Sequence, residues 1–283
     1  MNSKTRVARL SVFSNSFLIF LKVIAGLLSG SVSIISEAIH SSMDLLASII
    51  AYFAVRISDT PSDEKHNYGH GKIENVSGVV EGMLIFVAAG WIIFEAVSKM
   101  THIEPVESLG IGSLVMLISA VVNTLVSRRL YKTARETHSV ALEADALHLK
   151  TDVYTSLGVS AGLLLIWITK LHWLDPLIAI LVALLIIRES FTLLKRAFFP
   201  LLDIAWDPDE LQRLNTIFEG MEVKHHDVKT RRAGNHRFID FHIEMPPDRS
   251  FAEVHDFCSQ IENEIHRNFE NVQITIHAEP FDH

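Results

Sequence analysis

Long apolar runs dominate the first 200 residues of the chain, and a polar, alternating pattern replaces them beyond about residue 206. A helix of ~20 residues crosses the hydrocarbon core of a bilayer, and the apolar runs recur at about that length. We expect six membrane-spanning helices, at residues 8–29, 32–56, 74–98, 107–129, 140–168 and 173–190.

The polar pattern after residue 206 predicts a small soluble domain. "DPDELQRLNTIFEG" begins with an Asp cap and a Pro and ends in Gly, which is typical of a helix. "VKHHDVKTR" and "HRFIDFHIEMP" predict strands around a turn, "SFAEVHDFCSQIENEIHRNF" has helical apolar spacing, and "NVQITIHAEP" predicts a last strand. The order αββαβ favours a small α+β domain of the metallochaperone or ferredoxin-like kind, so we divide the chain into residues 1–200 and 201–283.

Charge follows the same division. The last part, from Leu201, holds 17 acidic and 8 basic residues, a balance of −9, and the rest of the chain holds 16 and 17, a balance of +1. An acidic soluble domain argues against nucleic acid as a partner, because nucleic acid needs a basic surface. Cys258 is the only cysteine, which excludes an internal disulfide and a thiolate zinc cluster.

Basic residues collect in the connections on one side of the expected spans, as with Arg128, Arg129 and Lys132 after the fourth span. The positive-inside rule places these connections in the cytoplasm and, with an even number of spans, both termini as well. The opening stretch "MNSKTRVARL" lacks a small-residue cleavage site, so it predicts a retained first span. We expect an integral protein of the lipid bilayer, in a bacterial inner membrane.

Two expected spans carry ionisable residues in the same order. The second span holds Glu37, His40 and Asp44, and the fifth holds Asp145, His148 and Asp152 at the same offsets. Offsets of three and four residues share one helix face, so each histidine projects beside the aspartate that follows it. Two such helices side by side would join two imidazoles and two carboxylates, a ligand set that Zn²⁺ accepts. Glu37 and Asp145 would then be supporting acids, which fix a histidine tautomer or line the entrance.

Other interpretations of these residues remain open. Each pair could be a polar contact between helices, although a matching pair in a second span disfavours this. Glu-x-x-His, as in "EAIH", also occurs in di-iron carboxylate enzymes built on helix bundles, which would make the chain a membrane oxidase or hydroxylase. The fifth span offers Asp145 in place of that Glu, and no HExxH motif of metalloproteases is present. A metal-sensing scaffold that transports nothing is a third possibility.

Three stretches resemble a known family. "SVSIISEAIHSSMDLLAS", "HNYGHGKIE" and "EADALHLKTDVYTS" resemble the second-span signature, the loop that follows it and the fifth-span motif of the cation diffusion facilitators. The resemblance covers almost the whole chain, and Glu37 departs from the family pattern. It implies a homodimer, not an enzyme, that exports a divalent metal in exchange for protons. Zinc is the expected substrate, with Fe²⁺, Co²⁺, Cd²⁺ or Mn²⁺ as alternatives.

The resemblance also implies roles for individual residues. His40, Asp44, His148 and Asp152 match the transport site, and Asp63, His66 and His70 match a cytoplasmic loop site. In the tail His226, His242, His255, His277 and Glu279 match a binuclear zinc site at the dimer interface. Lys72 and Asp203 match a charge pair at the joint between the two domains. No prosthetic group is implied; zinc would be the substrate and, in the tail, a regulatory or structural ion.

Overall fold

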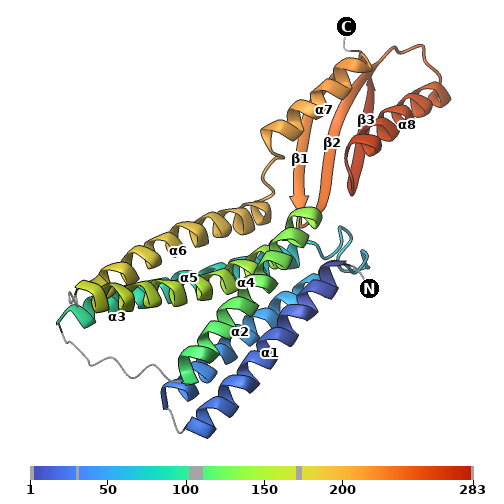
Figure 1. Cartoon of the computed structure of the whole chain (residues 1–283). Coiled ribbons are helices and arrows are strands. Elements are labelled where there is room, and N and C mark those ends of the chain that lie inside the picture. Colours follow the sequence, from blue (N-terminus) through green and yellow to red (C-terminus); the bar gives the residue numbers. More distant parts are fainter. Residues whose placement is uncertain (1–2, 30–31, 102–110, 170–173, 282–283) are drawn as a thin grey trace. The chain divides into compact units, whose positions relative to one another are not determined.

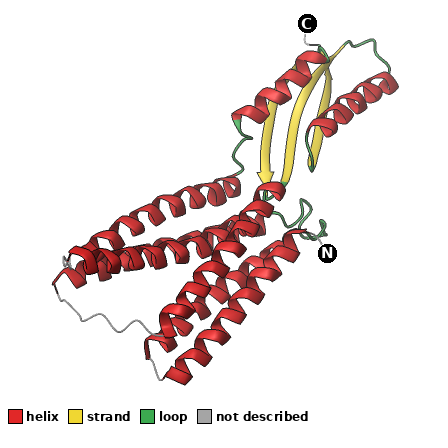
Figure 2. Cartoon of the chain, viewed as in Figure 1, coloured by secondary structure: helices red, strands yellow, loops and turns green. Residues whose placement is uncertain are grey.

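The computed structural model describes residues 3–29, 32–101, 111–169 and 174–281, apart from some helical side chains inside those ranges. It divides into two compact units, Met1–Phe198 and Phe199–His283. The first unit is helical, and the second combines helices with a three-stranded sheet (Figure 2).

Six long helices make up the described first unit: α1 (Ser3–Ser29), α2 (Val32–Ser58), α3 (Lys72–Thr101), α4 (Ile111–Thr137), α5 (Val140–Thr169) and α6 (Leu174–Phe198). Helices α4 and α6 run beyond the span ends expected at 129 and 190. An apolar run marks only the part suited to hydrocarbon, whereas backbone hydrogen bonding continues the helix into the basic segment that follows. The start of the span expected at 107–129 and residue 173 lie outside the described residues.

Three helical stretches among the described residues are long and apolar enough to cross a membrane: Ser3–Leu28, Lys72–Ser98 and Pro176–Leu202. Large apolar side chains on them are widely exposed, with Phe20 at 64% and Trp91 at 65%. Such apolar surface suits contact with hydrocarbon chains rather than water. The prediction of a mostly helical membrane domain is confirmed, whereas the number of six crossings stays a prediction.

Small residues bring the helices close together. Helices α3 and α6 lie side by side (Figure 1), and a Cβ at Gly82 would lie 3.0 Å from the side chain of Leu194. Ser190 Oγ donates a hydrogen bond to the Gly82 carbonyl at 2.7 Å. Close backbone approach of this kind is how helices gain contact area in a bilayer, where hydrocarbon offers no hydrophobic driving force between them.

A buried ion network ties together the ends of four helices near the loop 59–71. Lys4 Nζ of α1 lies 2.9 Å from Glu74 Oε1 of α3 and 2.7 Å from Asp59 Oδ1, which follows α2. Ser58 Oγ donates to Glu74 Oε1 at 2.7 Å, and Ser139 Oγ, just before α5, donates to the other carboxylate oxygen. The side chains of Lys4 and Glu74 are 2% and 1% exposed, so this charge pair is shielded from water.

The second unit begins with a short 3-10 helix, η1 (Phe199–Leu202), and continues as α7 (Pro208–Gly220), β1 (His225–Ala233), β2 (His236–Met245), α8 (Phe251–Asn268) and β3 (Val272–Pro280). The central strand β2 pairs antiparallel with β1 and parallel with β3. Ser250 and Glu253 form a capping box that starts α8. The order αββαβ and the α+β class of this unit are confirmed.

The two faces of this sheet differ in character. Strand β2 turns Ile239, Phe241 and Ile243 into one apolar cluster, where side chains of α7 and α8 join them. Side chains alternate along a strand, so His242 lies on the opposite face. Both helices therefore pack on one face, and the histidine-bearing face has no helix of the described second unit over it.

A carboxylate on α7 holds the helix to the sheet. Arg237 Nη2 lies 2.9 Å from Glu210 Oε1, and Arg232 pairs with the other carboxylate oxygen. Burial opposes ionisation of Glu210, but the hydrogen bonds from the two arginines outweigh it and hold the pKa of this carboxyl below its ordinary value.

Candidate metal centres

Helices α2 and α5 bring three metal-binding side chains together inside the first unit. Ligand atoms of Asp44, His148 and Asp152 all lie within 4.8 Å of one another. His148 and Asp152 share a face of α5 because four residues make about one helical turn. Packing of α2 against α5 supplies Asp44, whose Oδ1 lies 3.0 Å from His148 Nε2. One imidazole and two carboxylates thus converge, three of the four ligands expected for a tetrahedral site.

The fourth expected ligand, His40, belongs to α2 one turn before Asp44, but its side chain lies outside the described residues. The same holds for the side chain of Glu37. Among the described ligands, Asp44 is 10% and His148 is 16% exposed at the side chain. Two carboxylates, Asp44 and Asp152, inside the helical unit are costly in a membrane unless a cation neutralises them. A divalent ion matches their combined charge.

Asp145 is fully buried one turn before His148, and it contacts a polar chain that runs through three helices. Ser48 Oγ of α2 donates to Asp145 Oδ1 at 2.9 Å. On α1, Asn15 Nδ2 donates to Ser48 Oγ at 2.7 Å, and Ser11 Oγ lies 3.1 Å from the same Ser48 Oγ. The hydrogen bonds described for Asp145 therefore come from Ser48 of α2 and Ser11 of α1, and not from the His148 ring. Its role as a supporting acid stays a prediction.

The sequence reasoning missed Glu81, an acid in the first half of α3 that is fully buried. Ser77 Oγ donates to Glu81 Oε1 at 3.0 Å, and Asp145 and His148 both interact with it electrostatically. The signal was available, because an acid within "VSGVVEGMLIFVA" is as costly in hydrocarbon as the acids that were singled out.

The loop between α2 and α3 gathers a second set of ligands. Atoms of Asp63, His66 and His70 lie within 4.8 Å of one another. His66 Nδ1 is 3.2 Å from Asp63 Oδ1, and His70 Nε2 is 3.5 Å from Asp63 Oδ2. The backbone N–H groups of His66 and Lys65 donate to Asp63 Oδ1, and these bonds lower the pKa of that carboxyl. The acid is therefore held in the ionised form that a metal needs.

The histidine-bearing face of the sheet gathers a third set. His226, His242 and Glu279, one from each strand, place ligand atoms within 4.8 Å of one another. The register pairs His226 with His242 and His242 with His277, so three imidazoles form a row across the sheet. His226 Nε2 lies 2.8 Å from Glu279 Oε1, and His277 Nε2 lies 3.8 Å from Glu279 Oε2.

Two further acids of this face were not singled out from the sequence. His226 Nδ1 lies 3.7 Å from Glu244 Oε1, and His242 Nε2 lies 3.9 Å from Asp227 Oδ2. The alternation along β2 would have found Glu244, two residues after His242. His255 lies exposed on α8, which packs on the other face of the sheet, and is not among the described residues that converge here.

Lys72 and Asp203 belong to different compact units. Lys72 is the first residue of α3, and Asp203 follows η1, where its Oδ1 lies 3.7 Å from Arg231 Nη1. The pairing of Lys72 with Asp203 stays a prediction.

Comparison with known proteins covers nearly the whole chain. Residues 8–202 match the cation efflux transmembrane domain, and residues 207–281 match the cytoplasmic domain of cation efflux proteins. The chain is 35% identical to an uncharacterized transporter of Synechocystis sp., over 93% of this chain and 86% of that protein. It is 34% identical to the cation-efflux pump FieF of Shewanella oneidensis, over 96% of this chain and 93% of the pump.

Among solved structures, one titled as the mode of action of a putative zinc transporter, CzrB, is 32% identical, covering 28% of this chain and all of that chain with a TM-score of 0.27. The two domain matches and the full-length relatives confirm the resemblance seen in the motifs. They also make the di-iron enzyme interpretation wrong, because the family consists of transporters. The chain belongs to the cation efflux family, the cation diffusion facilitators, and is a membrane transporter of metal cations.

Proposed function

We propose that this transporter exports Zn²⁺ from the cytoplasm in exchange for protons, as a homodimer in a bacterial inner membrane with both termini in the cytoplasm. Fe²⁺, Co²⁺, Cd²⁺ and Mn²⁺ are the alternative substrates by the same mechanism. The bacterial relatives support the location, and the match to a cation-efflux pump supports the direction.

The convergence of Asp44, His148 and Asp152 between α2 and α5 carries the proposal. These groups lie within one metal-coordination sphere of one another, and His40 would complete the set from the turn before Asp44. An imidazole-containing set favours zinc and its neighbours, whereas a purely carboxylate site would favour harder ions. Zinc also accepts the tetrahedral arrangement that four such ligands make.

Competition for the same atoms supplies the coupling to protons. A histidine nitrogen must be unprotonated to bind a metal, so metal binding releases protons. His148 Nε2 faces Asp44 Oδ1 at 3.0 Å, and a proton between these atoms would occupy the position that the metal needs. Exposure of the site to one side of the membrane and then the other would exchange one kind of ion for the other.

The two other clusters are proposed as sites for zinc outside the transport path. Asp63, His66 and His70 would hold an ion at the loop. The converging set of His226, His242 and Glu279 would hold a binuclear centre at the dimer interface, to which the family resemblance adds His277 and His255. The chemistry of both sets fits zinc, since each combines imidazole with carboxylate. Their position outside the spanning helices supports a regulatory or structural role, in which bound zinc stabilises one state of the dimer.

Flux through reconstituted vesicles tests the proposal. Vesicles that carry a zinc dye and a pH dye should show zinc movement driven by a pH gradient, with protons moving in the opposite direction. Asp44→Asn and Asp152→Asn should reduce zinc flux to the protein-free leak, whereas Glu136→Gln, an exposed acid of α4, should not. Zinc flux that survives both aspartate changes would overturn the site assignment.

Two further measurements separate the alternatives. Competition among Zn²⁺, Cd²⁺, Fe²⁺ and Mn²⁺, in the native protein and in His40→Asp, would identify the substrate. Zinc-dependent tightening of the dimer without any metal flux would contradict transport and favour a metal-sensing scaffold.

A further inference from the structure

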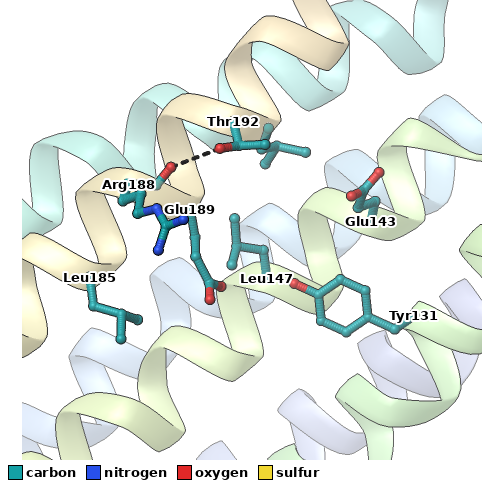
Figure 3. Close-up of a pocket in the computed structure, with 8 residues that line it drawn as sticks. Tyr131, Glu143, Leu147, Leu185, Arg188, Glu189 and Thr192 are labelled. Atoms are coloured by element: carbon teal, nitrogen blue, oxygen red, sulfur yellow. Dashed lines mark hydrogen bonds between the residues drawn. The ribbon is translucent and has the colours of Figure 1, made fainter.

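A cavity of about 350 Å³ lies among α4, α5 and α6, and none of the metal-binding residues proposed above lines it. Its polar side chains come from all three helices (Figure 3): Tyr131 of α4, Glu143 of α5, and Arg188, Glu189 and Thr192 of α6. Leucine side chains complete the lining, and Leu185 is 45% exposed on the outer surface. The cavity therefore combines polar groups with an apolar edge.

The charges around this cavity do not balance. Glu189 pairs with Lys150, whose Nζ lies 2.9 and 3.1 Å from the two carboxylate oxygens. Glu143 pairs with Arg196, whose Nη1 lies 2.7 Å from Glu143 Oε1. The ion pairs found at this cavity among the described residues join Glu189 to Lys150 and Glu143 to Arg196, and none of them includes Arg188. Among these five residues, two acids and three bases leave one positive charge, carried by the Arg188 guanidinium, and Arg135 adds another positive charge within electrostatic reach of Tyr131.

The cavity lies close to residue 190, where the expected sixth span, residues 173–190, ends. Leu181, Leu184 and Phe191 on α6 are 58%, 51% and 53% exposed, so the helix presents an apolar strip beside the cavity. The next turn of α6 holds Lys195 and Arg196, the basic residues of its last turn. An arginine at this level keeps its charged head at the headgroup region while its stem lies on apolar surface.

We infer that this cavity binds the headgroup of an anionic phospholipid, with the phosphate on Arg188 and the acyl chains along the exposed leucines of α6. Guanidinium binds phosphate through two parallel hydrogen bonds, which suits an arginine that pairs with no acid among the described residues. A negative headgroup would offset the excess positive charge around the cavity. Basic pockets between spanning helices are where such lipids bind. The inference is independent of the metal that the protein carries.

Lipid binding to the purified full chain tests the inference. Native mass spectrometry with added phosphatidylglycerol or phosphatidylethanolamine should show preferential binding of phosphatidylglycerol. Arg188→Gln should weaken this binding about fivefold, the effect of one basic residue near a headgroup. Arg56→Gln, an exposed arginine in the last turn of α2, is the matched control and should change little. Glu189→Gln should strengthen binding, because it removes a negative charge from the lining.

Three outcomes would overturn the inference. Equal binding of the two lipids would show that the positive charge at the cavity does not select an anionic headgroup. Equal losses in Arg188→Gln and Arg56→Gln would show general attraction to basic residues and not a site. Displacement of phosphatidylglycerol by millimolar inorganic phosphate would identify a soluble anion as the ligand in place of a lipid.

Discussion

The buried pair of Lys4 and Glu74 gives a sharp test of how the first unit is held together. Lys4→Met removes the ammonium and leaves the Glu74 carboxylate in a site where the side chain is 1% exposed. Loss of one partner from a buried pair costs about 3–5 kcal/mol, because the remaining charge is neither solvated nor neutralised. Ser58 and Ser139 still donate hydrogen bonds to the carboxylate, so we expect the lower end, about 3 kcal/mol.

A double-mutant cycle isolates the pair. Lys4→Met/Glu74→Met removes both charges, so its cost should fall short of the sum of the single changes by about 1–3 kcal/mol. The exposed pair Lys132–Glu136, at 3.8 Å and more than half exposed, is the control, and Lys132→Met should cost less than about 1 kcal/mol.

Steric-trap unfolding in bicelles gives the free energy of unfolding for each variant. A cost for Lys4→Met no larger than that for Lys132→Met would refute the reasoning. Strict additivity of Lys4→Met and Glu74→Met would refute it as well, since it would mean that the two charges do not interact.

Three other changes have expected outcomes. Glu210→Gln should destabilise the tail at neutral pH, because it removes the carboxylate that the two arginines bind. The difference in unfolding free energy between the variant and the native protein should vanish as pH falls through the pKa of Glu210, which lies below its ordinary value of 4.5. Pulsed hydrogen exchange at a fixed labelling pH measures this difference. Gly158→Val should lower the melting temperature in detergent and cost about 1–3 kcal/mol of stability, because even a Cβ at this position would lie 2.8 Å from Val182 Cγ2. Gly90→Ala is the control: there is open space around Gly90, so this change should be neutral or slightly stabilising. Ser250→Ala should cost the tail about 1 kcal/mol and raise hydrogen exchange in the first turn of α8 without affecting zinc flux.

Local periodicity alone predicted much of the tail and half of the membrane cluster. The spacing of His148 and Asp152 fixes them on one helix face in any fold, because the helical repeat is a property of the backbone. The order αββαβ also followed from local patterns, since strands alternate and amphipathic helices repeat every 3.6 residues. The ends of the helices were harder to predict from the sequence. Helices α4 and α6 continue past their apolar runs, because hydropathy indicates which residues suit hydrocarbon and not where the backbone hydrogen bonding of a helix stops.

Contacts between distant segments were decided only by tertiary structure. Asp44 and His148 are 104 residues apart, and only the packing of α2 against α5 brings their atoms to 3.0 Å. Packing likewise gave Asp145 its partner Ser48 on α2 and buried Glu81 in electrostatic reach of the same cluster. The sequence by itself determined which ionisable side chains lie within apolar helices, where their transfer from water costs free energy unless they bind a partner or an ion. The fold decided which of them meet, because convergence depends on how helices pack and not on spacing along one chain.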